Sequence, residues 1–152
     1  MAELNRDGTA IHYEWYPSAA QDAPSILLSH GYSATASMWH GQIKALTTTH
    51  NLITWDMRGH GRSASPEDPN AYSEQLSVDD MAGILRECGV ERAIIGGLSL
   101  GGYMTLAFHL AHPDMCDALS KPSDGLFSSR WNLPTRVRPF LAMAAAMHEM
   151  PT

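Results

Sequence analysis

The chain has 152 residues, a formal net charge of -6 and a pI of about 5.7, with 44% hydrophobic and 17% charged residues. This composition is typical of one soluble globular domain, and an acidic chain without a basic cluster argues against nucleic acid as a partner. No stretch approaches the ~20 apolar residues of a membrane span, and the two cysteines, Cys88 and Cys116, form neither a disulfide framework nor a metal-binding spacing. We therefore expect a cytoplasmic protein with no membrane contact, no metal and no cofactor.

The first part of the chain predicts a hairpin, a strand and a short helix. Residues 2–16 favour two strands joined at Asn5-Arg6-Asp7-Gly8, since Asp-Gly is a strong hairpin-turn pair. Residues 25–29 form a continuous apolar run, which is typical of a parallel strand covered on both faces. We expect Ser37 to cap the short helix that follows.

The middle of the chain continues the alternation of strand and helix. Residues 51–55 predict a strand that ends in the turn 56–63, which is rich in glycine and charge. A helix is expected to start at Ser77, with acidic residues in its first turn, and to stop at Gly89. A strand begins at Ala93, and a further helix over residues 100–112 stops before a proline. The alternation predicts an α/β fold with a mainly parallel sheet and helices on both faces.

The stretch Gly97-Leu98-Ser99-Leu100-Gly101-Gly102 has the form G-x-S-x-G between a predicted strand and a predicted helix. A serine on such a tight turn is exposed at the edge of the sheet, and the glycines remove side chains that would clash there. The helix that follows directs its free backbone N–H groups at the turn, so the amide of Leu100 is placed to stabilise a negative oxygen. The alternative is a glycine-rich turn with an incidental serine.

Three motifs together resemble the α/β-hydrolase fold superfamily, in its serine esterase, lactonase and haloperoxidase-like branch. They are Ser29-His30-Gly31-Tyr32, the turn Asp56 to Ser63, and the serine turn, each directly after a predicted strand. The resemblance spans about residues 8–114 and implies that Ser99 is the nucleophile. It also implies that the backbone N–H groups of Tyr32 and Leu100 form the oxyanion hole. The residues that support these motifs are His30, Gly31, Gly97, Gly101 and Gly102.

A serine at this position also bears on the reaction, because similar epoxide hydrolases and haloalkane dehalogenases carry aspartate there. The resemblance therefore implies hydrolysis of a small-molecule ester or lactone through an acyl-enzyme on Ser99. His30 and His60 precede the serine, whereas the family order is serine, acid, histidine, so we expect hydrogen-bonded loop histidines rather than a catalytic base. Arg58 and Arg62 are expected to brace a loop, the alternative being a clamp for an anionic substrate.

The last part of the chain departs from the pattern of the resemblance. Residues 115–119 favour the start of a further strand, but residues 120–139 contain proline breaks and no run of strand formers. We therefore expect residues 1–114 to be the N-terminal part of an α/β-hydrolase domain, C-terminally incomplete, and residues 115–152 to be an atypical, poorly ordered tail. Asp124 and His148 follow Ser99 in the order of the acid and the base, but without supporting strands.

Two other interpretations of the chain remain open. The first is a catalytically inactive, truncated or frameshifted fragment of such a hydrolase, which lacks the acid and the histidine. The second is an oxidoreductase, which is disfavoured because the glycines do not have the G-x-G-x-x-G spacing. If the tail supplies no strand beside the one at 93–96, that strand is an open sheet edge, and self-association through it is expected.

Overall fold

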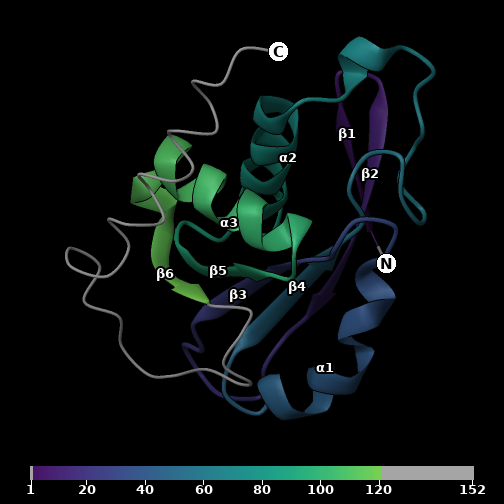
Figure 1. Cartoon of the computed structure of the whole chain (residues 1–152). Coiled ribbons are helices and arrows are strands. Elements are labelled where there is room, and N and C mark those ends of the chain that lie inside the picture. The colour runs from purple at the N-terminus through teal and green to yellow at the C-terminus, as the bar shows by residue number, and fades with distance from the viewer. Residues whose placement is uncertain (1, 121–152) are drawn as a thin grey trace.

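A computed structural model of the chain describes residues 2–120, so Asp124 and His148 lie outside the described residues (Figure 1). The strands are β1 (Ala2–Arg6), β2 (Thr9–Tyr16), β3 (Ser25–Ser29), β4 (Asn51–Trp55), β5 (Ala93–Gly97) and β6 (Cys116–Ser120). The helices are α1 (His40–Leu46), α2 (Glu74–Glu87) and α3 (Leu100–Ala111), with short 3-10 turns η1 (Ala36–Trp39), η2 (Pro69–Ala71) and η3 (Pro113–Met115). No helix within residues 2–120 is long and apolar enough to cross a membrane.

The strands form one sheet in the order β1-β2-β4-β3-β5-β6. β1 and β2 make the hairpin that the Asp-Gly turn predicts, and β2 also runs antiparallel to β4. β4, β3, β5 and β6 run parallel, so the predicted mainly parallel sheet is confirmed. Because β3, β4 and β5 are parallel neighbours, the motifs that follow them meet at one edge of the sheet.

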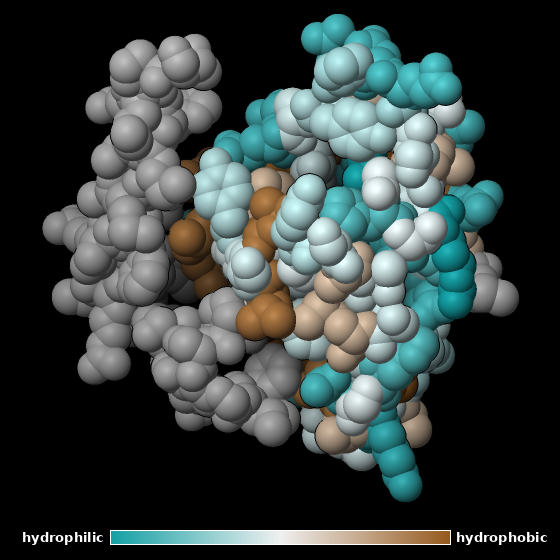
Figure 2. Space-filling model, turned by 45° about the vertical axis from the view of Figure 1, so that its right-hand side comes forward, coloured by the Kyte–Doolittle hydropathy of each residue, from teal (hydrophilic) through white to brown (hydrophobic). Residues whose placement is uncertain are grey.

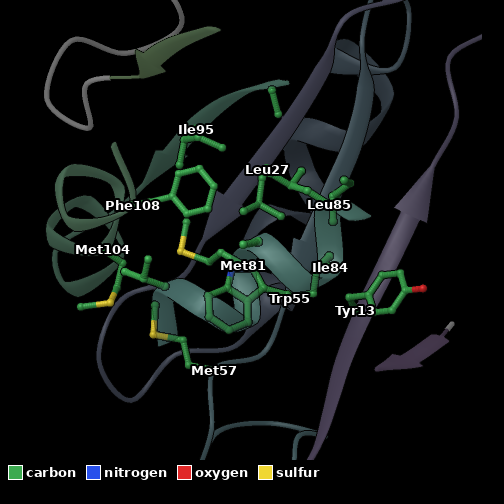
Figure 3. Close-up of a cluster of buried hydrophobic side chains, with 14 of the residues drawn as sticks. Tyr13, Leu27, Trp55, Met57, Met81, Ile84, Leu85, Ile95, Met104 and Phe108 are labelled. Atoms are coloured by element: carbon green, nitrogen blue, oxygen red, sulfur yellow. The ribbon is translucent and has the colours of Figure 1, made fainter. Parts of the chain in front are cut away.

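Helices cover both faces of this sheet, as predicted. α2 and α3 lie over one face, where Trp55, Met81 and Phe108 are among the fully buried side chains (Figures 1 and 3). α1 lies on the opposite side in Figure 1, and its Leu46 joins a smaller cluster with residues of β3 and β4. Neighbouring residues of β3 contribute to different clusters, because successive side chains on a strand point to opposite faces.

The outer surface of the described part is mixed in character. The face in Figure 2 is largely hydrophilic or neutral, with small hydrophobic patches. The large hydrophobic side chains that stay exposed are Tyr32, Tyr72, Leu98 and Leu110. Two of these, Tyr32 and Leu98, belong to the motifs that carry the predicted site.

Two predicted helix caps are wrong. α2 begins one turn earlier than expected, with Ser73 as its cap, and the Ser73 hydroxyl accepts the N–H of Leu76 at 3.1 Å. Ser77 lies inside the helix, where its own N–H donates to the Ser73 carbonyl at 3.1 Å. Ser37 lies inside η1 and shares a hydrogen bond with the Thr35 hydroxyl at 2.7 Å instead of capping a helix.

The strand expected to start at residues 115–119 is present as β6, and it pairs parallel with β5. The sheet therefore continues past the expected boundary at residue 114. It also makes β5 an inner strand, so the condition for an open edge at β5, a tail that supplies no neighbouring strand, is not met. Within residues 2–120, the outermost strands are β1 and β6.

Candidate active site

Ser99 occupies a strained turn between β5 and α3. Its backbone has φ 54° and ψ -113°, in the left-handed half of conformational space that side chains other than glycine rarely adopt. The Ser99 carbonyl accepts the N–H of Tyr103, which is the first hydrogen bond of α3, at 3.0 Å. The Ser99 residue is exposed, at the carboxyl end of an inner strand and at the N-terminus of a helix. This is the geometry predicted for a nucleophile elbow.

Glycines permit the close approach of three backbone segments at this turn. A Cβ added to Gly97 would lie 2.4 Å from the backbone carbonyl carbon of Gly101. A Cβ added to Gly101 would lie 2.2 Å from the carbonyl oxygen of Ser29, at the end of β3. Gly102 lies in the first turn of α3. Both clashes are with backbone atoms, which cannot move aside as a flexible side chain does, so Gly97 and Gly101 are structural requirements of the elbow.

The loop after β3 lies directly against the elbow. The N–H of Leu98 donates to the Ser29 carbonyl at 3.2 Å. A Cβ added to Gly31 would lie 3.7 Å from the Ser99 Cβ. Tyr32 follows Gly31 immediately, so its backbone amide and the serine lie on facing segments. The structure thus brings together the segments from which the sequence predicts the nucleophile and the two oxyanion-hole amides.

His30 is a buried loop histidine with both ring nitrogens engaged. Its Nε2 accepts the backbone N–H of Met57 at 3.0 Å, and its Nδ1 lies 2.7 Å from the carbonyl oxygen of Gly31. Since a backbone N–H only donates, Nε2 is unprotonated and Nδ1 carries the proton. Burial lowers the pKa of His30, because it disfavours the charged imidazolium. The side chain joins the loop after β3 to the loop after β4, as expected for a hydrogen-bonded loop histidine.

His60 is the second loop histidine. Its Nδ1 donates to the carbonyl oxygen of Arg58 at 3.0 Å. Its ring lies 5.0 Å from the ring of His30 and 5.9 Å, edge to face, from the ring of Tyr32. The three rings therefore form a contiguous contact between the two loops.

The two arginines of the turn 56–63 brace structure, as expected. Arg58 is buried and makes a bidentate pair with Asp80 of α2, with Nε–Oδ2 at 2.6 Å and Nη2–Oδ1 at 2.9 Å. The hydrogen bond to Asp80 raises the pKa of the Arg58 guanidinium further. Arg62 is half-exposed and pairs with Glu14 of β2 at 2.9 Å.

Two aspartates have roles that the sequence patterns do not indicate. The buried Asp56 carboxylate accepts the N–H of Ala36 at 2.7 Å and the N–H of Arg62 at 3.0 Å, which fixes the loops after β3 and β4 to each other. Asp80 is one of the acidic residues that the sequence predicts for the first turn of this helix, but it is fully buried and paired with Arg58. Hydrophobic spacing does not place Asp80 in the apolar stripe of α2, and its partner Arg58 lies on a distant segment, so no local pattern indicates this burial.

The predicted acid and base, Asp124 and His148, lie outside the described residues. Among residues 2–120, no group of three or more His, Cys, Asp or Glu side chains is arranged to hold a metal ion.

Comparison with known proteins identifies the family. The family model for the alpha/beta hydrolase fold matches residues 24–120. A putative carbamate hydrolase RutD from Caulobacter segnis is 35% identical over 108 residues, which is 71% of this chain and 40% of that protein. Epoxide hydrolase B of Mycobacterium tuberculosis is 33% identical over 114 residues, 74% of this chain and 32% of the relative.

Solved structures agree with these relatives. The enol-lactonase from Burkholderia xenovorans superposes with a TM-score of 0.72 at 30% identity, over 78% of this chain and 45% of that chain. Est816, described as an N-acyl homoserine lactone degrading enzyme, superposes with a TM-score of 0.71 at 30% identity, over 78% of this chain and 43% of that chain. The chain thus spans 32% to 45% of the length of these four proteins. With its elbow, its loops and its sheet order, the chain belongs to the α/β-hydrolase fold family.

Proposed function

We propose that this chain carries the nucleophile and the oxyanion hole of a serine hydrolase that acts on a small ester or lactone. The observation that carries the proposal is Ser99 itself, exposed and strained at the tip of the elbow. Two of the similar solved structures are named for lactone substrates, which supports a lactone or a related ester. The serine favours acyl transfer over the epoxide chemistry of other relatives, because a serine attacks an acyl carbon to form an ester that water then hydrolyses.

The chemistry follows from the placement of the groups. The Ser99 hydroxyl attacks the substrate carbonyl carbon and loses its proton to a base, and the carbonyl oxygen becomes negative. The N–H groups of Tyr32 and Leu100 stabilise this oxyanion. Collapse of the intermediate breaks the carbon–oxygen bond of the substrate, the leaving oxygen takes the proton back from the base, and an ester remains on Ser99. Water then releases the acid and restores the serine.

A base is the remaining requirement, and it separates two hypotheses. Asp124 and His148 stand in the right order to act as acid and base. The competing hypothesis is that this chain is catalytically inactive by itself, because His30 and His60, on the loops beside the elbow, are committed to loop hydrogen bonds. In serine hydrolases the loss of the histidine lowers kcat by roughly a millionfold, while the oxyanion hole and binding retain about a thousandfold over water.

The test compares the 152-residue chain with the same chain extended by a C-terminal half from a related hydrolase. We expect the chain alone to hydrolyse p-nitrophenyl acetate near background, with little change in Ser99→Ala. The extended protein should be active, should react with a fluorophosphonate probe at Ser99, and should lose both properties in Ser99→Ala. The exposed Ser37 supplies the matched control, since Ser37→Ala should leave both unchanged.

Two results would contradict these expectations separately. Activity of the extended protein that survives Ser99→Ala would show that Ser99 is not the nucleophile. Strong turnover by the chain alone that disappears in Ser99→Ala would reject the inactive hypothesis. His148, with Asp124 behind it, would then be the first base to mutate.

A further inference from the structure

A chain of hydrogen bonds crosses from the loop after β4 to the loop after β3 and ends at the peptide bond before Tyr32. The Met57 N–H donates to Nε2 of His30 at 3.0 Å, and Nδ1–H of His30 donates to the carbonyl oxygen of Gly31 at 2.7 Å. The same carbonyl accepts the N–H of Ala34 at 3.1 Å. The Gly31 carbonyl and the Tyr32 N–H belong to one planar peptide unit, so fixing the first fixes the direction of the second.

We propose that His30 is a positioning residue for the oxyanion hole, which orients and polarises the Tyr32 amide through the Gly31 carbonyl. The proposal rests on the proposed function, since it takes the Tyr32 N–H as an oxyanion donor. All the hydrogen bonds of the series run in one direction, from Met57 through His30 to Gly31, and hydrogen bonds in such a series strengthen one another. The Tyr32 N–H, in the same peptide unit as the Gly31 carbonyl, therefore becomes a stronger donor.

The role requires one protonation state and one tautomer of His30, and the surroundings favour both. The imidazole is fully buried, which disfavours its charged form. The ring of His60 faces it at 5.0 Å, with Nδ1–H already donated to Arg58. The Asp56 carboxylate, which acts on His30 in the opposite direction to burial, accepts the N–H groups of Ala36 and Arg62.

We call the two hydrogen bonds of His30, from Met57 and to Gly31, the relay. Two substitutions each remove one of these hydrogen bonds and keep the other. In His30→Asn the amide nitrogen reaches the place of Nδ1, so the donor to the Gly31 carbonyl is kept and the acceptor for Met57 is lost. In His30→Gln the amide oxygen reaches the place of Nε2, so the acceptor for Met57 is kept and the donor to Gly31 is lost. A merely structural role predicts that the two variants differ only as their stabilities differ.

The first readout needs no enzymatic activity. In the labelled 152-residue chain, NMR of the wild type should show the Nδ1–H tautomer of His30. His30→Gln should move the Gly31 carbonyl carbon and the Tyr32 amide proton upfield, toward values of a weaker hydrogen bond, whereas His30→Asn should hold both near wild type. An Nε2–H tautomer in the wild type, or equal shifts in the two variants, would overturn the proposal. The tautomer measurement needs no variant, so an Nε2–H result overturns the proposal even if a variant does not fold.

The second readout is kinetic, in the extended protein. Removal of one oxyanion-hole donor costs roughly 100- to 1000-fold in kcat, so a weakened donor in His30→Gln should lower kcat about 10-fold with KM unchanged. His30→Asn should recover most of that loss, and a fall of equal size in both variants would contradict the relay. If Ser99→Ala shows that no activity depends on the serine, the proposed function has failed, while the NMR experiment still tests the relay.

Discussion

At the scale of single residues, the elbow depends on two glycines, which have no Cβ atom. The backbone of α3 can approach β3 and β5 only because Gly97 and Gly101 have no Cβ. The resulting proximity places Ser99 and the loop of Gly31 on facing segments. Replacement of either elbow glycine is therefore a change in backbone packing rather than in a side-chain contact.

We predict that Gly101→Ala destabilises the fold by about 2 kcal/mol or more, because the new methyl group meets the Ser29 carbonyl oxygen and overpacking forces the backbone to shift. Gly41→Ala is the matched control, since that glycine lies in α1 with no atom within 4 Å of an added Cβ. Because alanine favours a helix more than glycine does, Gly41→Ala should raise the free energy of unfolding by up to about 1 kcal/mol. Urea unfolding of the two variants is the measurement, and equal effects would contradict the close approach.

His30 predicts a pH dependence of stability. Its folded-state pKa lies below the unfolded value, because burial disfavours the charged ring. The unfolded chain therefore binds the proton first as pH falls, and the contribution of neutral His30 is complete above a pKa of about 6.5 and is lost progressively below it. We expect Tm to fall between about pH 7.5 and about pH 5.5, and to fall less in His30→Gln.

The exposed His40 supplies the control for this experiment, since His40→Gln removes a histidine without removing a buried one. The wild-type slope of Tm against pH should persist in that variant. An unchanged slope in His30→Gln would show that the buried imidazole does not couple folding to protonation.

At the scale of elements, one ion pair attaches the turn after β4 to α2. Arg58 and Asp80 lie 22 positions apart in the sequence, and both are buried. Arg58 also donates to the carbonyl oxygen of Ala71 in η2 at 3.3 Å. One guanidinium group therefore binds both η2 and α2 to the turn after β4. This arrangement holds the loop of Met57 and His60 against the site.

We predict that Asp80→Ala destabilises the fold by about 3–5 kcal/mol, because it leaves the Arg58 charge buried without its partner. Asp117→Ala is the control, since Asp117 pairs with Arg92 on the surface and its loss should change stability little. Guanidinium-induced unfolding distinguishes the two cases. Arg6, whose Nε lies 3.6 Å from Asp80, loses the same carboxylate in this variant. A small effect of Asp80→Ala would therefore show that water solvates the Arg58 charge in place of the ion pair.

At the scale of the whole molecule, the sheet ends at β1 and β6 within residues 2–120. Within the described residues β6 pairs only with β5, so its other edge is unpaired. We therefore expect self-association through β6 and not through β5. We predict concentration-dependent association in sedimentation velocity, with amide protons of β6 becoming more protected from exchange as concentration rises. The amide protons of β1, at the opposite edge of the sheet, give the comparison within the same molecule. A compact monomer at every concentration would contradict the prediction.

Much of the fold could be predicted from the sequence, because its signals are local. The apolar run at 25–29 and the Asp-Gly turn each specify structure within a few residues. The family motifs after β3, β4 and β5 then predict where the site lies, since parallel strands bring their carboxyl ends together.

The errors and omissions have physical reasons too. Ser73 and Ser77 lie one helical turn apart, so hydrophobic periodicity does not decide which of them is the cap. The two hydrogen bonds of His30 and the pairing of Arg58 with Asp80 join segments distant in the sequence, and no local pattern encodes such distances.

The backbone of Ser99 has a further consequence, which concerns selection. A residue other than glycine at φ 54° and ψ -113° costs of order 1–3 kcal/mol, and glycine would adopt this conformation without that cost. Ser99→Gly should therefore raise the folding stability of the chain while it removes the proposed nucleophile. In a library mutated at this position and selected only for thermal stability, glycine should become enriched over serine and alanine, and no enrichment would contradict the strain. Selection for stability alone would therefore favour glycine at this position, so the requirements of folding do not explain the serine.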